Sequence, residues 1–367
     1  MKYYIIAGEA SGDLHGSNLI KALKEEDAAT DVRCWGGDLM ETAGATLVKH
    51  YRDLAFMGFV EVLKNLRTIF RNLSFCKRDI IAYRPDAIIL IDYPGFNLRI
   101  AKWAKEQGYK IIYYISPQVW AWKENRVKSI KRCVDKMLVI LPFEKAFYKK
   151  WDYEVEYVGH PLVEVIEAWK SAHGEEVKED IIALLPGSRQ QEILKKLPVM
   201  LEVSAFFPEY RFVVAMAPGL EKTFYDTLLA SYGNVKAVSG KTYSLLMQSC
   251  AALVTSGTAT LETALFGVPE VVCYKGSRIS YEIAKRVIRI KYISLVNLIM
   301  DKPVVTELIQ QELTVDNLRR ELQLILTDQD RLKRMGQDYR QLRALLSEGG
   351  HASMNAARAI RGFMQGH

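Results

Sequence analysis

The chain lacks any long hydrophobic run, and this absence excludes one class of protein. No uncharged apolar stretch among the 367 residues approaches the roughly 20 residues that a membrane-spanning helix needs. The first residues form a brief apolar run that enters a glycine turn, without the longer apolar core and cleavage site of a secretory signal. Low-complexity tracts are also missing. We therefore expect a cytoplasmic protein, or one that binds a membrane peripherally.

Cysteine and histidine are too scattered to predict a metal or disulfide site. The five cysteines are odd in number, widely spaced and without a C-x-x-C pair, which indicates buried free thiols. His15 and His160 have no second ligand at metal spacing, so we expect no metal and no cofactor. The formal net charge of +7 favours an anionic partner, such as a nucleotide, a nucleic acid or lipid headgroups.

Two short glycine-bearing turns are the most informative features present. The apolar run Lys2–Ala7 leads into Gly8–Asp13, and the apolar run Ile181–Leu185 leads into Pro186–Arg189. Small residues at a strand-to-helix turn let a ligand approach the backbone, and the free N–H groups with the helix dipole attract an anion. Each turn is therefore a candidate site for a nucleotide or a sugar phosphate.

The spacing of apolar runs predicts an α/β fold in two domains. Further buried strands are expected at 87–91, 110–115, 136–140, 211–215, 251–254 and 269–274, with helical patterns between them. This alternation predicts two doubly wound, Rossmann-like domains that face each other across a cleft. We place the domains at 1–165 and 178–345, with the polar stretch 169–180 as linker. The amphipathic C-terminal helix, about 350–367, is expected to pack back on the first domain.

The second half carries a set of residues typical of nucleotide binding. After the expected strand 251–254, the turn continues into a helix whose first turn holds Glu262. A carboxylate there can accept both ribose hydroxyls, while the turn residues hold phosphate oxygens. The plain alternative is an ordinary helix start that Glu262 stabilises through the dipole. The expected nucleotide-binding residues are Gly187, Ser188, Arg189, Ser256, Gly257, Thr258 and Glu262, with Arg189 neutralising a diphosphate.

Asp92 is the candidate general base in the first half. It ends the expected strand 87–91 and precedes a chain reversal at Tyr93–Asn97. A carboxylate at the carboxyl end of a parallel strand points into the crevice where a base is useful. The alternative is a turn-forming Asp that bonds its own backbone, and position alone slightly favours that alternative.

Aromatic and basic residues follow the expected strand 110–115. Trp120 and Trp122 precede a run that includes Lys123 and Arg126. This pattern suits single-stranded nucleic acid, a lipid surface or a sugar. Because no RNA- or DNA-binding module is recognisable, we do not expect nucleic acid to be the partner.

The segment 56–75 is open to two interpretations. Its apolar residues fall on one helical stripe: Phe59, Val62, Leu63, Leu66, Ile69 and Phe70, with Leu73. Lys64, Arg67 and Arg71 lie on or beside the other face. A core helix has this pattern, and so has a helix that lies in a membrane interface with its cations toward anionic headgroups.

Taken together, the motifs resemble the lipid-A-disaccharide synthases, which are inverting glycosyltransferases of the GT-B fold. The matching blocks occur in the family's order and cover most of the chain. They are residues 8–13, 57–62, 91–97, 116–122, 141–144, 159–162, 184–189, 256–262 and 294–298. Gly95 stands where the family often has a second Asp, and Cys250 stands where an acidic residue is common.

This resemblance implies a reaction and a set of partners. UDP-2,3-diacylglucosamine would donate its sugar to 2,3-diacylglucosamine 1-phosphate (lipid X), giving the β(1→6) lipid A disaccharide 1-phosphate and UDP. It further implies no metal, the nucleotide in the C-terminal domain, the acceptor on the N-terminal domain and the cytoplasmic face of the inner membrane as location. Asp92 and Arg189 would be catalytic. The sugar region would include Glu9, Ser11, Gly12, Asp13, Asn97, Gln118, Trp120, His160 and Asn297.

Two other classes of function stay open at this point. An enzyme like UDP-N-acetylglucosamine 2-epimerase shares the two-domain architecture and a similar ribose-binding glutamate, but needs no acceptor. A non-catalytic, nucleotide-regulated membrane module would keep the UDP contacts without turnover. A homodimer is likewise left open.

Overall fold

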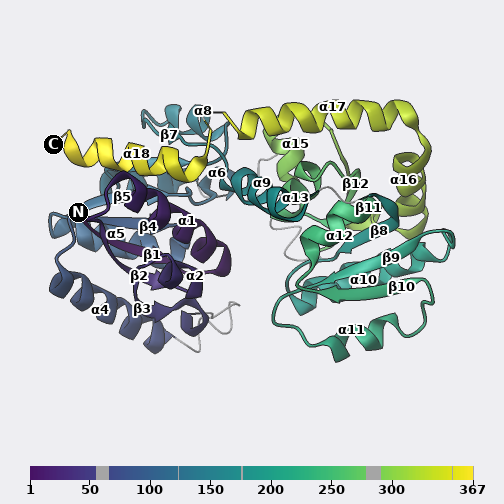
Figure 1. Ribbon diagram of the computed structural model, residues 1–367, viewed down its shortest axis with the longest axis horizontal. Coiled ribbons are helices and arrows are strands. Elements are labelled where there is room, and N and C mark those ends of the chain that lie inside the picture. The colour runs from purple at the N-terminus through teal and green to yellow at the C-terminus, as the bar shows by residue number, and fades with distance from the viewer. Residues whose placement is uncertain (55–65, 123, 175–176, 278–290, 349, 367) are drawn as a thin grey trace. The chain divides into compact units, whose positions relative to one another are not determined.

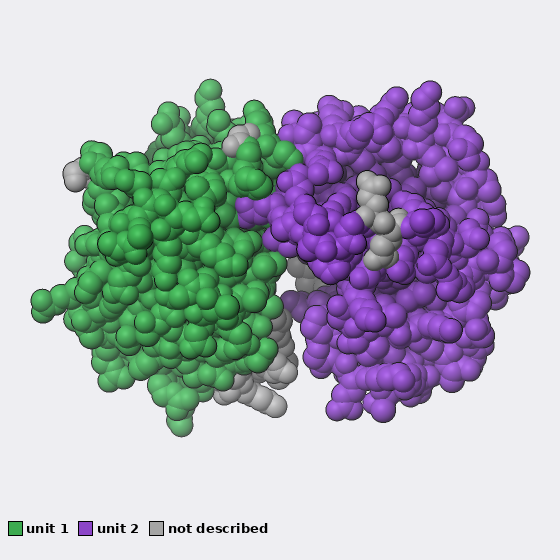
Figure 2. Space-filling view, viewed as in Figure 1, with its two compact units in different colours: residues 1–161, 346–367 green, residues 162–345 purple. Residues whose placement is uncertain are grey.

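The computed structural model describes residues 1–54, 66–122, 124–174, 177–277, 291–348 and 350–366. The chain divides into two compact units, which Figure 2 colours separately. Unit 1 comprises residues 1–161 and 346–367, and unit 2 comprises residues 162–345. Each unit is built on a parallel sheet of its own.

Unit 1 contains a seven-stranded sheet (Figure 1). Its strands are β1 (Lys2–Ala7), β2 (Asp31–Gly36), β3 (Thr46–His50), β4 (Ala87–Ile91), β5 (Lys110–Tyr114), β6 (Lys136–Val139) and β7 (Glu156–Tyr157). All neighbours pair in parallel, in the order β3-β2-β1-β4-β5-β6-β7. The order reverses between β1 and β4, and in such sheets ligands bind at the carboxyl ends of the strands beside this switch point.

Helices cover both faces of this sheet. They are α1 (Ala10–Glu26), α2 (Asp38–Thr42), α4 (Leu66–Tyr83), α5 (Pro94–Glu106), α6 (Val119–Trp122), α7 (Val127–Cys133), α8 (Glu144–Lys149) and α18 (Ala352–Gln365). Along β1, Tyr4 and Ile6 join the apolar cluster with residues of α4 and α5, whereas Ile5 and Ala7 join the cluster with residues of α1 and α18. This alternation is the period of two expected of a strand buried on both faces.

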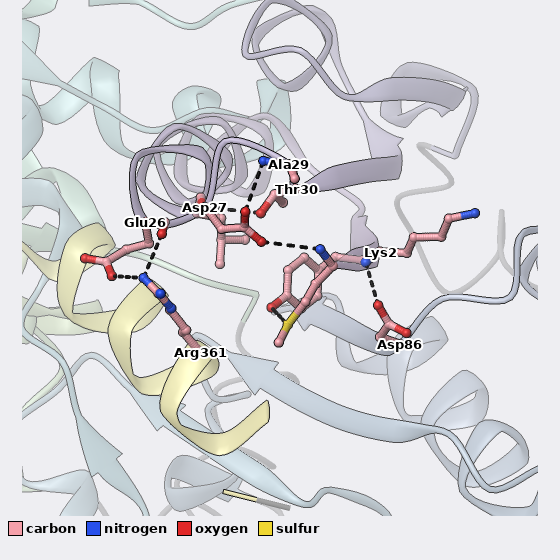
Figure 3. A network of polar contacts seen from close by, with 10 residues as sticks. Lys2, Glu26, Asp27, Ala29, Thr30, Asp86 and Arg361 are labelled. Carbon is pink, nitrogen blue, oxygen red and sulfur yellow. Dashed lines mark hydrogen bonds and ion pairs between the residues drawn. The ribbon is translucent and has the colours of Figure 1, made fainter. Parts of the chain in front are cut away.

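The C-terminal helix α18 packs on α1 within unit 1. Ala356 and Ile360 are fully buried in the cluster on that face of the sheet. At the edge of this contact, the Arg361 guanidinium donates to the carbonyl and carboxylate oxygens of Glu26 at 2.7 and 3.0 Å (Figure 3). Residues 346–367 thus complete a unit whose strands come from the beginning of the chain.

Unit 2 contains a six-stranded sheet of the same kind (Figure 1). Its strands are β8 (Glu179–Leu185), β9 (Arg211–Met216), β10 (Val235–Ser239), β11 (Ser249–Thr255), β12 (Glu270–Tyr274) and β13 (Thr306–Ile309). All pair in parallel, in the order β10-β9-β8-β11-β12-β13, so the switch point lies between β8 and β11. The helices are α9 (Pro161–His173), α10 (Gln190–Ser204), α11 (Lys222–Leu229), α12 (Thr242–Gln248), α13 (Thr258–Leu265), α15 (Leu295–Met300), α16 (Val315–Thr327) and α17 (Gln329–Leu346).

The polar stretch 169–180 is not a linker, and this expectation was wrong. Its first residues continue α9, and β8 begins at Glu179. Trp169 packs edge-on against Tyr243 and Phe266, with ring centroids 5.9 and 5.8 Å apart. The chain passes from unit 1 to unit 2 between Pro161 and Leu162. The polar face of an amphipathic helix has the composition of a linker, so composition alone misplaced the boundary.

Candidate functional site

The residues expected to hold a nucleotide gather at the switch point of unit 2. The turn 186–189 follows β8, and the turn 256–257 follows the adjacent β11. Gly187, Ser188, Ser256, Gly257, Thr258 and Glu262 line one cavity of about 260 Å³. Six of the seven predicted nucleotide contacts therefore share a cavity, and the seventh, Arg189, lies at its edge, 3.7 Å from the lining residue Glu192.

Both turns have a backbone conformation that requires glycine. Gly187 has φ +125° and Gly257 has φ +146°, and side-chain-bearing residues rarely adopt either value. A Cβ on Gly187 would also lie 3.0 Å from Oε2 of Glu192. The turns lead into α10 and α13, whose first N–H groups and positive dipole ends favour an anion.

Glu262 is held by a tyrosine that the sequence analysis did not identify. The hydroxyl of Tyr243, from α12, donates to Oε1 of Glu262 at 3.1 Å. Burial raises the pKa of Glu262, and this hydrogen bond partly opposes the rise. With one oxygen fixed in this way, the carboxylate has a defined orientation toward a ligand. Tyr243 lies in a different element, and no motif connects the two residues.

Asn297 does not line the cavity that contains the expected nucleotide-binding residues. Its side-chain amide donates to the carbonyl of Val305 and to the carboxylate of Glu307, each at 2.9 Å, and its oxygen accepts from the Val305 N–H. It lines a different cavity, of about 610 Å³. The structure therefore places Asn297 as a residue that fixes the segment leading into β13.

A strained turn positions Asp92 at the carboxyl end of β4. Asp92 and Tyr93 have φ values of +41° and +49°, a conformation that costs of order 1–3 kcal/mol per residue. The Asn97 amide and the Tyr113 hydroxyl both donate to the Asp92 carbonyl, at 2.8 and 2.6 Å. A Cβ on Gly8 would lie only 2.3 Å from the Tyr93 ring. Gly8 and Asn97 thus allow the turn that aims Asp92.

Asp92 has the electrostatics of a base that works near neutral pH. Burial and, to a smaller extent, the nearby Glu9 raise its pKa to about 6, an effect that the hydrogen bond from the Tyr93 N–H partly opposes. Both carboxylates follow strands that border the switch point of unit 1. A carboxyl group with such a pKa can accept a proton from a hydroxyl and release it again near pH 7.

The other residues of the first glycine turn have separate roles. Ser11 is exposed, and Gly12 packs against β1, where an added Cβ would lie 3.0 Å from the Ala7 Cβ. Asp13 is buried and accepts from the backbone N–H groups of Gly37, Leu39 and Met40. Its carboxylate therefore fixes the start of α2.

The remaining predicted sugar-region residues follow β5 and β7. Gln118 is exposed, whereas the indole nitrogen of Trp120 is buried. The indole faces the buried Glu144 carboxylate and helps to lower its pKa, which burial raises to about 7. His160 is 5% exposed. Burial lowers the pKa of His160 to about 3 and that of His15 to about 4, so both rings are neutral at pH 7.

The apolar stripe of 56–75 is only partly within the described residues. Phe59, Val62 and Leu63 lie outside them, as does the side chain of Leu66. Ile69 packs against the apolar cluster of unit 1, and Leu73 is 7% exposed within that cluster. Phe70 is 60% exposed. The described part of the stripe is therefore split between a core face and an exposed phenylalanine.

The two residues that depart from the family pattern have different surroundings. Gly95 lies where an added Cβ would meet no atom within 4 Å. The Cys250 thiol donates to the carbonyl of Ile181 at 3.3 Å.

In the part of the chain that the structure describes, no group of three or more His, Cys, Asp or Glu side chains could hold a metal ion. No described helix is both long enough and apolar enough to cross a bilayer.

Comparison with protein families identifies close relatives of the chain. The family model described as lipid-A-disaccharide synthetase matches residues 3–360. A lipid-A-disaccharide synthase of Syntrophus aciditrophicus is 40% identical over 368 residues, which cover 97% of this chain and 96% of that protein. The enzyme of the same name from Geobacter metallireducens is 40% identical over 358 residues, covering 94% and 93%.

Solved structures show a similar fold at low sequence identity. S. aureus MnaA with UDP has a TM-score of 0.71 at 13% identity, covering 99% of this chain and 97% of that one. UDP-GlcNAc 2-epimerase from Neisseria meningitidis bound to UDP-GlcNAc has a TM-score of 0.67 at 13% identity, covering 100% of both chains. The expected fold, two Rossmann-like domains of the GT-B type, is confirmed.

The surroundings of Asp92 predict a raised titration midpoint. The carboxyl carbon of Asp92, followed by NMR in protein labelled with ¹³C-aspartate and assigned with Asp92→Asn, should titrate near pH 6, against 3.8 for an ordinary Asp. Glu9→Gln should lower this midpoint, because it removes a neighbouring negative charge. Ser11→Ala, in the same turn, is the control and should leave it unchanged. A wild-type midpoint near 4 would contradict this account.

Proposed function

The chain belongs to the lipid-A-disaccharide synthase family, and on that premise we propose its substrates and mechanism. As a member, it is a glycosyltransferase that makes the lipid A disaccharide. We propose that UDP-2,3-diacylglucosamine is the donor and lipid X the acceptor. The products would be UDP and the β(1→6)-linked disaccharide 1-phosphate. The nucleotide would bind unit 2 and the acceptor unit 1.

The proposed reaction inverts the anomeric carbon in one displacement. The 6-hydroxyl of the acceptor attacks this carbon from the face opposite UDP, and the bond from the carbon to the phosphate oxygen breaks. Asp92 accepts the hydroxyl proton, and the electron pair of the broken bond leaves with UDP. General base catalysis of this kind typically contributes 10²–10⁴-fold. The raised pKa and the fixed turn of Asp92 support this role.

Charge that develops on the leaving diphosphate would be met by unit 2. The turns at Gly187 and Gly257 present backbone N–H groups, and Arg189 adds a cation at the cavity edge. We propose that these groups do the work that a metal does in other transferases, and that no metal or cofactor is needed. Glu262 would accept the ribose hydroxyls. The convergence of both turns on one cavity is the observation that carries this proposal.

An epimerase-like activity is the alternative that the test must distinguish from the proposed glycosyl transfer. The 2-epimerase structures resemble this chain in fold at 12 to 13% identity, which supports the fold alone. An epimerase would convert a nucleotide sugar without an acceptor. Release of UDP and formation of a disaccharide only when both acylated substrates are present would support the transferase.

Asp92→Asn should lower kcat at least about a hundredfold while UDP binding stays nearly intact, because only proton removal in the transition state is lost. The control is Asp86→Asn, at the other end of β4, where the carboxylate accepts from the Lys2 N–H at 2.7 Å. That variant should keep its kcat. An Asp92→Asn enzyme with unchanged kcat and raised KM would make Asp92 a binding or turn residue instead.

Arg189→Ala and Glu262→Gln should both lower kcat/KM, the first through kcat and the second through KM. Arg189 faces charge that grows as the phosphate leaves, so its loss should depress kcat. Glu262 would hold the ribose in the ground state and the transition state alike, so its loss should raise KM. EDTA should leave the wild-type rate unchanged. Activity that depends on added Mg²⁺ would refute the role given to Arg189.

We also propose that the protein associates peripherally with the cytoplasmic face of the inner membrane. Both substrates carry acyl chains, and α4 presents exposed Phe70 beside Arg67 and Arg71. Each Lys or Arg near an anionic surface contributes about 1 kcal/mol. The prediction that Phe59, Val62, Leu63 and Leu66 contact acyl chains concerns side chains outside the described part of the structure. A homodimer also stays a prediction.

Phe70→Ser with Arg71→Gln should reduce cosedimentation with vesicles of anionic phospholipid and keep the melting temperature. The exposed ring contributes about 25 cal/mol per Å² of apolar area only when it is bound to lipid. Ile69→Ser is the contrasting variant, because Ile69 packs against the core cluster, and it should lower the melting temperature. Unchanged vesicle binding by the double variant would count against this surface.

A further inference from the structure

Lys196 is a buried lysine directly behind the nucleotide cavity. It lies on the side of α10 that faces the sheet and is 3% exposed. Its ammonium donates to the hydroxyl of Thr255, the last residue of β11 and part of the cavity wall. A Cβ placed on Gly187 would lie 3.4 Å from the Lys196 Nζ. Lys196 therefore reaches the ends of both strands that border the switch point.

The neighbours of Lys196 leave its charge incompletely balanced. The nearest carboxylate is Glu192, 3.9 Å away, and the Arg189 guanidinium lies 3.7 Å from the same carboxylate. One half-buried carboxylate thus faces two cations, and Lys195 adds a third, exposed one on the same helix. Burial lowers the pKa of Lys196, and Glu192 opposes this effect. A buried ammonium is costly unless an anion compensates for it.

We propose that Lys196 is a positioning residue for the donor diphosphate, which draws Arg189 away from Glu192 and so leaves that carboxylate to balance the buried ammonium. This inference rests on the proposed function and extends it. When the diphosphate occupies the cavity, the Arg189 guanidinium leaves the Glu192 carboxylate and binds phosphate oxygens. The Lys196 ammonium then remains as the cation that pairs with Glu192. Through Thr255 and the Gly187 turn, the ammonium also holds the N–H groups of both turns in place. Lys196 would act through these groups without touching the sugar.

The test compares UDP with uridine, which lacks the diphosphate, in calorimetric binding measurements. Lys196→Met should weaken UDP binding at least about tenfold, because Glu192 is then left to compete with the diphosphate for Arg189, and should leave uridine binding within about twofold of wild type. Lys195→Met removes the same charge from the exposed neighbour and should leave both affinities near wild type. The salt dependence of UDP binding should fall in Lys196→Met alone.

A second variant separates charge from hydrogen bonding. Lys196→Gln keeps a donor for Thr255 without the charge, and it should weaken UDP as Lys196→Met does. Three results would each overturn the inference. They are wild-type UDP affinity in Lys196→Gln, equal losses of UDP and uridine affinity in Lys196→Met, and wild-type UDP affinity in Lys196→Met. Wild-type protein that binds no UDP would refute the proposed function itself, and the inference with it. If Lys196→Met does not fold, the Gln variant alone decides through its UDP affinity relative to uridine.

Discussion

The constraint on which both candidate sites depend is the switch point of a parallel sheet. Neighbouring strands run in the same direction while their connections leave to opposite sides, so a crevice opens at the carboxyl ends between β1 and β4 and between β8 and β11. Each bordering turn has to reverse the chain without filling that crevice. Gly8, Gly187 and Gly257 meet this requirement through close approach or positive φ. The residues that follow then start helices whose N–H groups point at the opening.

The turns after β1 and β8, which are equivalent in the two sheets, carry charges of opposite sign. In unit 1, the strand ends carry Asp92 and Glu9, and the burial of Asp92 together with repulsion from Glu9 raises the pKa of Asp92. In unit 2, the turn after β8 carries Arg189, with Lys196 behind it. A carboxylate that readily takes a proton suits an attacking hydroxyl, and a cationic turn suits a departing diphosphate. The same sheet topology thus supports the two halves of a proposed displacement.

Local patterns predicted the central strands and the ligand turns, because continuous apolar runs followed by small residues are short-range signals. Local patterns failed where contacts between distant parts of the chain determine which side chains are buried. The polar face of α9 has the composition of a linker, but in the structure Trp169 of this helix packs on Tyr243 and Phe266. The stripe of α4 has one helical period, yet Ile69 packs on the core while Phe70 is exposed. The sequence analysis did not single out Lys196, because its burial depends on the sheet beneath α10.

The turn at Asp92 shows why several sequence motifs are mutually dependent. Two consecutive residues with positive φ are held by hydrogen bonds from Asn97 and Tyr113 to one carbonyl oxygen. Tyr93 fits only because position 8, directly after the neighbouring strand β1, lacks a side chain. Residues from three adjacent strand ends therefore stabilise a conformation that none of them would adopt alone. A carboxylate held in this way has little freedom to turn, which would favour its proposed role as a base at the expense of local stability.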